Sequence, residues 1–177
     1  DVCSSDLAGL FIIGCGDLGN IKVDKTSTFT FDLNPEEMGV EEGVPAPKPG
    51  ETTKDKTIDF AKELESSGVN EKQIRDVSIK SLKVGTSPNG ALHMGKQYDE
   101  SSPLLFKVRA DGNVVASGDV ALGDLNGDNH IPIQTKGGGK DYLEKRLKNL
   151  DEVKFTTVVE YPKGLVIEQP VSAEVVV

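Results

Sequence analysis

The feature that most constrains the fold is a pair of alternating segments, residues 104–110 and 114–122, joined by a short turn. Apolar or small residues occupy every second position of both segments, and the string between them is Asp111-Gly112-Asn113. Asp-Gly is a strong signal for a tight hairpin turn. Because successive side chains of a strand point to opposite faces, the pattern predicts two antiparallel strands that bury one face.

Similar alternation predicts further strands over residues 21–33, 77–84, 131–133, 153–161, 165–167 and 171–177. The segment 77–84 changes phase after Ile79, which indicates a bulge. Residues 57–66 and 140–150 have helical spacing, and Gly137-Gly138-Gly139 reads as a flexible joint before the second helix. About eight short strands with turns between them favour a mostly β chain. We therefore expect an antiparallel β-sandwich, Ig-like or related, with two short helices.

Residues 34–56 interrupt this pattern. The segment carries Pro35, Pro45, Pro47 and Pro49, together with the acidic pairs Glu36-Glu37 and Glu41-Glu42, and it has no apolar period. Such a composition predicts an exposed, acidic, Pro-rich loop. At this length a loop inside a compact domain is either mobile or functional. We place it within one sandwich domain over residues 21–177.

The N-terminal region holds an apolar run over residues 7–15. A helix needs about 20 apolar residues to cross a bilayer, so this run is too short, but it has the length of a signal-peptide core. It ends in Ile12-Ile13-Gly14-Cys15. That string resembles the lipobox of bacterial lipoproteins, and with the strand pattern the chain is similar to small β-sandwich lipoproteins. The resemblance implies that residues 1–14 are a signal-peptide remnant, residues 15–20 a tether, and Cys15 the lipid attachment site.

The first residues do not fit a signal peptide. Residues 1–7 carry no initiating Met and no Lys or Arg, and they resemble translated sequencing-adapter read-through. Cys3 is then not native. Two alternatives stay open: residues 7–15 could form a buried strand with an incidental Cys15, or Cys3 and Cys15 could pair as a disulfide. The chain stops inside its last alternating segment, at Val177, so we expect this end to be cut as well.

The charge excludes some classes of partner. The chain has 20 Lys and Arg against 29 Asp and Glu, a formal net charge of −9. Nucleic-acid binding needs clustered basic residues, and so does electrostatic binding to anionic lipid, so we expect no nucleic acid and a membrane contact made by acyl chains alone. The chain has no Trp and three Tyr, which disfavours an aromatic platform for carbohydrate.

A second motif lies at Asp124-Leu125-Asn126-Gly127-Asp128-Asn129-His130. Asp124, Asn126 and Asp128 match the first three ligand positions of an EF-hand-type calcium loop and are similar to the start of a dockerin repeat. With His130 they are the candidate residues for a Ca²⁺ site. The usual Gly at position 6 is Asn129 and the usual acid at position 12 is Thr135. The alternative is an ordinary Asn-Gly turn between two strands.

Nothing in the sequence favours an enzyme. His93 and His130 are expected in loops without a zinc set, no Gly-x-Ser-x-Gly string occurs, and Lys145, Arg146 and Lys148 read as a solvated helix face. We predict a lipid-anchored protein of the periplasm or cell surface with a structural or binding role, whose partner is another envelope protein or a second copy of the chain. The alternatives are a self-assembling fibre or pilus-type subunit, whose first and last strands pair between copies, and a calcium-dependent adhesive module.

Overall fold

The computed structural model describes residues 28–65, 78–87, 91–125 and 130–176. The predicted signal remnant, the tether and Cys15 lie outside these ranges. In chain order the elements are β1 (Thr28–Leu33), α1 (Pro35–Met38), β2 (Gly50–Asp59), α2 (Phe60–Glu65), β3 (Leu82–Ser87), β4 (Leu92–Met94), β5 (Pro103–Ala110), β6 (Asn113–Ala121), the 3₁₀ turn η2 (Leu122–Asp124), β7 (Ile131–Thr135), α3 (Gly137–Lys148), β8 (Glu152–Tyr161), β9 (Leu165–Ile167) and β10 (Val171–Val176).

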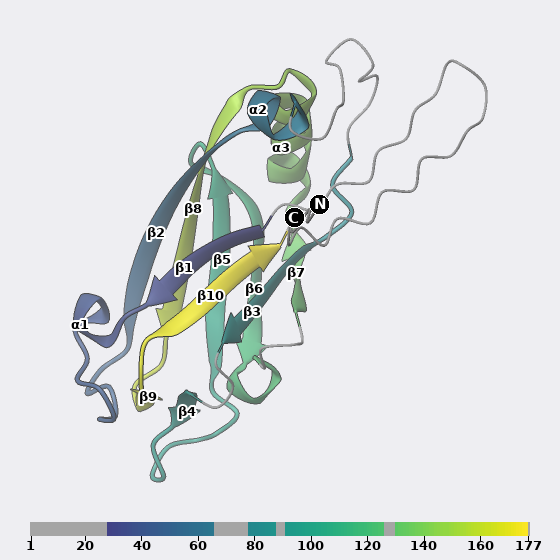
Figure 1. Ribbon diagram of the computed structural model, residues 1–177. Helices are drawn as coiled ribbons and strands as arrows, with labels where there is room; N and C mark the ends of the chain where they lie inside the picture. The colour runs from purple at the N-terminus through teal and green to yellow at the C-terminus, as the bar shows by residue number, and fades with distance from the viewer. Residues whose placement is uncertain (1–27, 66–77, 88–90, 126–129, 177) are drawn as a thin grey trace, which may run out of the picture.

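Two layers of antiparallel strands make the body of the protein. The strand order is β1-β10-β3-β7-β6-β5-β8-β2, and a two-stranded sheet of β4 and β9 lies at one end. Figure 1 shows β1, β10 and β3 crossing in front of β2, β8 and β5, with β6 and β7 joining the layers along one side. The prediction of a mostly β, antiparallel sandwich is confirmed. Two short helices were expected, whereas the described residues contain three.

The predicted hairpin is the centre of one layer. β5 pairs with β6 from Pro103↔Ala121 to Ala110↔Asn113, and the register shifts between Val108 and Arg109. Asp111 and Gly112 have φ values of 47° and 86°, so both turn residues are left-handed. Two left-handed central residues define a type I′ turn, whose twist matches that of paired strands.

The core lies between the two layers. Its largest fully buried side chains come from strands of both layers and from α3, among them Phe106, Phe155, Leu82, Val84 and Leu143. The rings of Phe60 and Phe155 meet edge to face, with centroids 6.3 Å apart. Burying such side chains contributes about 1.5–3 kcal/mol each, so the inward-facing alternation is what stabilises the fold.

The prediction of a loop over residues 34–56 is wrong at both ends. Pro35–Met38 forms α1, where the Asn34 side chain accepts a hydrogen bond from the Glu36 N–H at 3.0 Å. Gly50–Asp59 forms β2, and all ten of its residues pair with β8. This strand is polar because it lies at the edge of the sheet, where only Thr52 and Ile58 are buried. Its last residues also replace the start of the helix predicted over 57–66.

The remaining connection, residues 40–49, is held against β9. The Gly43 N–H donates to the Ile167 carbonyl, the Ala46 N–H donates to the Leu165 carbonyl, and the Gly164 N–H donates to the Ala46 carbonyl, all within 2.9 Å. Ala46 is fully buried. This acidic, Pro-rich segment is therefore fixed to β9 by backbone hydrogen bonds.

The three consecutive glycines do not form a joint. Gly137 to Gly139 are the first turn of α3, which runs to Lys148. A Cβ added at Gly139 would lie 1.8 Å from the Val114 carbonyl oxygen, whereas at Gly138 it would meet nothing within 4 Å. Gly139 is thus the point where the helix backbone touches β6. Periodicity cannot reveal such an approach, because glycine lacks the side chain that makes the pattern.

The predicted strand over residues 77–84 also begins later than expected. β3 starts at Leu82, and the Ile79 N–H just before it donates to the Glu144 carboxylate of α3 at 2.8 Å. None of the helices in the described ranges is long and apolar enough to cross a membrane.

Substitution of Gly139 tests this packing. We expect Gly139→Ala to lower the free energy of unfolding by about 1–3 kcal/mol, because the helix must move away from β6. Gly138→Ala is the matched control: it adds the same methyl group in open space and should stabilise the protein by up to about 1 kcal/mol. Urea denaturation followed by circular dichroism measures both, and equal midpoints for the two variants would contradict the close approach.

Candidate functional site

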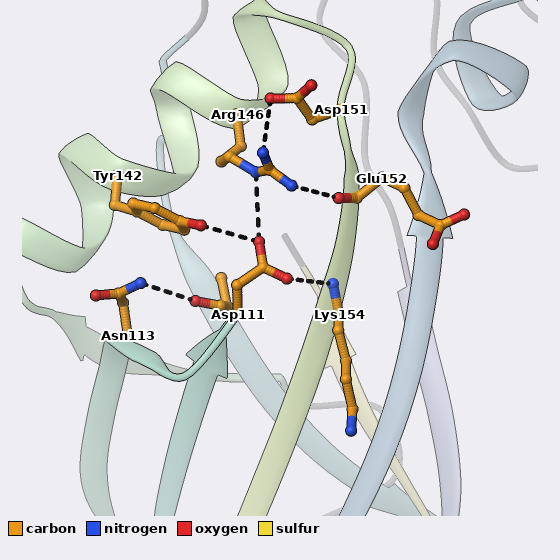
Figure 2. Close-up of polar contacts among 8 residues, drawn as sticks. Asp111, Asn113, Tyr142, Arg146, Asp151, Glu152 and Lys154 are labelled. Carbon is orange, nitrogen blue, oxygen red and sulfur yellow. Dashed lines mark hydrogen bonds and ion pairs between the residues drawn. The ribbon is translucent and has the colours of Figure 1, made fainter.

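The largest polar cluster in the described part of the chain surrounds Asp111, in the β5–β6 turn (Figure 2). One of its carboxylate oxygens accepts the Lys154 N–H of β8 at 3.0 Å. The other oxygen accepts the Tyr142 hydroxyl of α3 at 3.0 Å and lies 3.3 Å from the Arg146 Nε. The Asp111 N–H also donates to the Lys154 carbonyl at 2.9 Å. One side chain thus joins a turn, a helix and a strand.

Arg146 forms the second half of this cluster, which we call the Asp111 clasp (Asp111, Tyr142, Arg146, Asp151 and Lys154). Its guanidinium lies 3.0 Å from the Asp151 carboxylate and donates to the Glu152 carbonyl at 2.8 Å. These contacts fix the connection between α3 and β8. The expectation that the whole Lys145, Arg146 and Lys148 face is solvated is therefore wrong for Arg146, which points toward the turn (Figure 2).

The chemistry of the clasp is structural. Both Asp111 oxygens are occupied by donors from the protein itself. Burial and the nearby Asp111 carboxylate raise the pKa of Tyr142, so its hydroxyl stays a proton donor at neutral pH. No nucleophile stands beside a free base in this group. We assign the clasp to holding α3 on the end of the sheet and give it no catalytic role.

A second polar contact lies at the opposite end of the sandwich. His93 was expected in a loop, but it is the central residue of β4. Its Nε2 lies 2.8 Å from the Glu168 carboxylate, and its Nδ1 lies 3.1 Å from the Met94 carbonyl oxygen. The Met94 carbonyl and then Glu168 raise the pKa of His93 above its usual value. About half of each side chain is exposed, at 46% for His93 and 52% for Glu168.

The residues of the predicted calcium loop are only partly described. Asp124 is exposed at the end of η2, and His130 precedes β7, with its ring against Gly85. The Thr86 hydroxyl donates to the Leu125 carbonyl at 2.8 Å, which ties the start of this loop to β3. Asn126 and Asp128 lie outside the described residues. The calcium site, and a calcium-dependent binding role with it, therefore stay predictions.

Cys15, the predicted lipid attachment site, also lies outside the described ranges, so its role stays a prediction. Sequence reasoning missed the clasp because its residues are up to 43 positions apart and share no motif. The one available signal was the Asp-Gly turn, since aspartate in such a turn has its carboxylate free to accept hydrogen bonds from neighbouring backbone.

Comparison with known proteins adds no functional assignment. No family model matches the chain, and no curated protein matches it. Among solved structures, a chain from the structure of infectious bursal disease virus, Gx strain, aligns over 99% of this chain with 13% identity and a TM-score of 0.24. This chain spans 39% of the length of that one. A TM-score this low supports no conclusion about fold or function.

Substitution of Asp111 tests the clasp. Asp111→Ala should lower the free energy of unfolding by about 1–2 kcal/mol, since at a partly exposed site it removes the acceptor of two hydrogen bonds and one partner of the ion pair with Arg146. Asp111→Asn keeps a residue that tolerates the left-handed turn and should cost less. Asp119→Ala on neighbouring β6 is the control and should change stability by less than about 0.5 kcal/mol.

Thermal and urea unfolding of these variants provides the measurement. A double-mutant cycle between Asp111→Ala and Tyr142→Phe should show coupling, because the two side chains share a hydrogen bond. Additive effects in that cycle, or an Asp111→Ala variant as stable as Asp119→Ala, would show that the clasp does not hold α3.

Proposed function

We propose that this chain is a lipid-anchored protein of the bacterial envelope, facing the periplasm or the outside, with a structural or binding role and no enzymatic one. The observation that carries the proposal is the string Ile12-Ile13-Gly14-Cys15 at the end of a short apolar run. Two or three acyl chains on Cys15 would make a stable anchor, since each buried CH₂ contributes about 0.8 kcal/mol.

The body of the protein suits such a role. The most organised polar groups of the described residues, in the Asp111 clasp, bind one another and leave no free reactive group. The net charge of −9 opposes direct contact with anionic lipid headgroups, so the anchor would carry the attachment alone. A sandwich held at a membrane only through a lipid on Cys15 would keep its surface available to partners.

Metabolic labelling tests the anchor. Residues 1–6 are replaced by Met-Lys-Lys-Lys to supply a basic start, and the protein is expressed in a bacterium fed an alkynyl fatty acid. We expect a labelled, membrane-associated protein whose mass shows cleavage before Cys15 and added acyl chains. Cys15→Ser should abolish both the label and the membrane association, because serine cannot form the thioether.

Gly14→Ala is the matched control. It keeps a small residue before the cysteine, so labelling should persist at a level close to that of the parent protein. An unlabelled parent, or a label that survives Cys15→Ser, would exclude Cys15 as the attachment site and remove the basis for the envelope assignment.

One observation favours a second function, self-assembly by strand addition. The first and last predicted strands pair with each other, and β10 also pairs with β3, so β10 has no free edge. β1 lies at the end of the strand order and has one edge without a strand partner in the described residues. The other terminal strand, β2, carries Lys54, Asp55 and Lys56, and such charges discourage edge-to-edge pairing. We infer that β1 is the edge a second copy would use.

Assembly should then depend on the β1 edge. Electron microscopy and sedimentation of the protein at high concentration should show polymers or dimers. Thr30→Lys should dissociate them, because it places a charge at an exposed position of β1. Thr53→Lys places the same charge on exposed β2 and should leave assembly unchanged. A parent protein that stays monomeric at high concentration would exclude this second function.

A further inference from the structure

One end of the sandwich is built from three short backbone segments that lie next to one another. β9 pairs with β4 through Leu92↔Ile167, His93↔Val166 and Met94↔Leu165. On its other side β9 receives the Gly43 and Ala46 N–H groups of the connection after α1. The Glu168 N–H closes the ladder by donating to the Ala91 carbonyl at 3.0 Å. We call these three segments, residues 43–46, β4 and β9, the end sheet.

Buried apolar side chains on β4 and β9, among them Leu92, Met94, Leu165 and Ile167, anchor the inner side of the end sheet in the core. β4 and β9 contain three residues each, and an isolated pair of short strands is marginally stable in water. Its side-chain link across the surface is His93 to Glu168, which joins the middle of β4 to the residue after β9. Changes in this link should therefore act on the exposed side of the end sheet, where His93 and Glu168 are about half exposed.

The two partners of the His93 ring determine its protonation. The Met94 carbonyl oxygen and the Glu168 carboxylate can only accept hydrogen bonds, and they face the two different ring nitrogens. A neutral imidazole donates from one nitrogen only, whereas the imidazolium donates from both. The observed geometry is therefore satisfied in full only by the protonated ring.

We propose that His93 is a pH-dependent switch. Protonation of its ring closes the end sheet, and loss of the proton loosens it. This inference goes beyond the proposed function and does not depend on the anchor. In the neutral ring one nitrogen becomes an acceptor that faces another acceptor, so one of the two contacts must break. Release of the Glu168 side chain then leaves the start of the β9–β10 connection tied to the residue before β4 by the hydrogen bond from the Glu168 N–H to the Ala91 carbonyl.

Among the described residues, Glu168 is the charged side chain in contact with the His93 ring. β4 has no other titratable residue, and the connection beside β9 brings Glu41 and Glu42, which directly precede Gly43 in sequence. η2 contacts β4 and carries Asp124, which is exposed. Glu168 is the charged group that acts on the pKa of His93, and the ring's other partner is the Met94 carbonyl.

The sign of the effect follows from the raised pKa of His93. A group that binds its proton more tightly in the folded state stabilises that state below its unfolded pKa, about 6.5 for histidine. The stabilisation is lost as the pH rises through the folded pKa. The end sheet should therefore be most closed in mildly acidic solution and open more often above neutral pH.

NMR titration of the full chain is a direct test, because the sequence contains only two histidines. We expect His93 to titrate above about 6.5, and Glu168→Gln to lower that pKa toward the value of an unperturbed histidine. Hydrogen exchange of the Gly43 and Glu168 amides, corrected for the intrinsic pH dependence of exchange, should speed up as His93 loses its proton. Each unit of raised pKa corresponds to about a tenfold change in the opening equilibrium.

His93→Gln is the variant that separates the effect of His93 protonation from general effects of pH. It removes the titrating group at an exposed position, so amide protection in the end sheet should become independent of pH between about 5.5 and 8. His130→Gln serves as the matched control and should leave the pH dependence of exchange in the end sheet unchanged. A His93 pKa at or below 6.5, or the same pH-dependent exchange in His93→Gln, would overturn the proposal.

Discussion

The pairing of β8 on both of its edges is the constraint on which the rest of the structure depends. β8 pairs with β2 over ten residue pairs and with β5 over six, so it lies between these two strands and is hydrogen-bonded along both of its edges. Its inward residues, among them Val153, Phe155 and Val159, are almost fully buried. Because this strand is apolar on its inner face and continuously bonded at both edges, it can order a neighbour that has little apolar content of its own.

That dependence explains which strands the sequence could predict. β5, β6, β8 and β10 bury one face, so their apolar residues alternate and the pattern is readable. β2 lacks this alternation. It is an edge strand rich in Thr, Lys and Asp, and its pairing with β8 is what orders it. β4 is three residues long, which is too short for a period to appear. The overall class was predictable because the core strands carry the signal, and the missed strands are those ordered by their neighbours.

The polar groups show a similar division. Spacing along the chain points to local motifs such as Ile12-Ile13-Gly14-Cys15 and Asp124-Leu125-Asn126. The contacts of Asp111 with Tyr142 and Lys154, and of His93 with Glu168, instead join side chains to groups that are 31 to 75 positions away. Their partners are often backbone groups, which every residue type offers alike. No pattern of residue types can predict such contacts. The register of β5, β6 and β8 brings the Asp111 clasp together, and the pairing of β4 with β9 brings His93 to Glu168.

The pairing of β1 with β10 has a consequence for the order in which the protein folds. These strands join residues 28–33 to residues 171–176, and β10 also completes the pairing of β3. Contacts between distant parts of a chain form slowly, because a long loop must close before they contribute stability. The layer of β1, β10 and β3 therefore cannot complete its pairing until residues 171–176 are available. Until β10 arrives, β1 and β3 expose strand edges that a chaperone could bind.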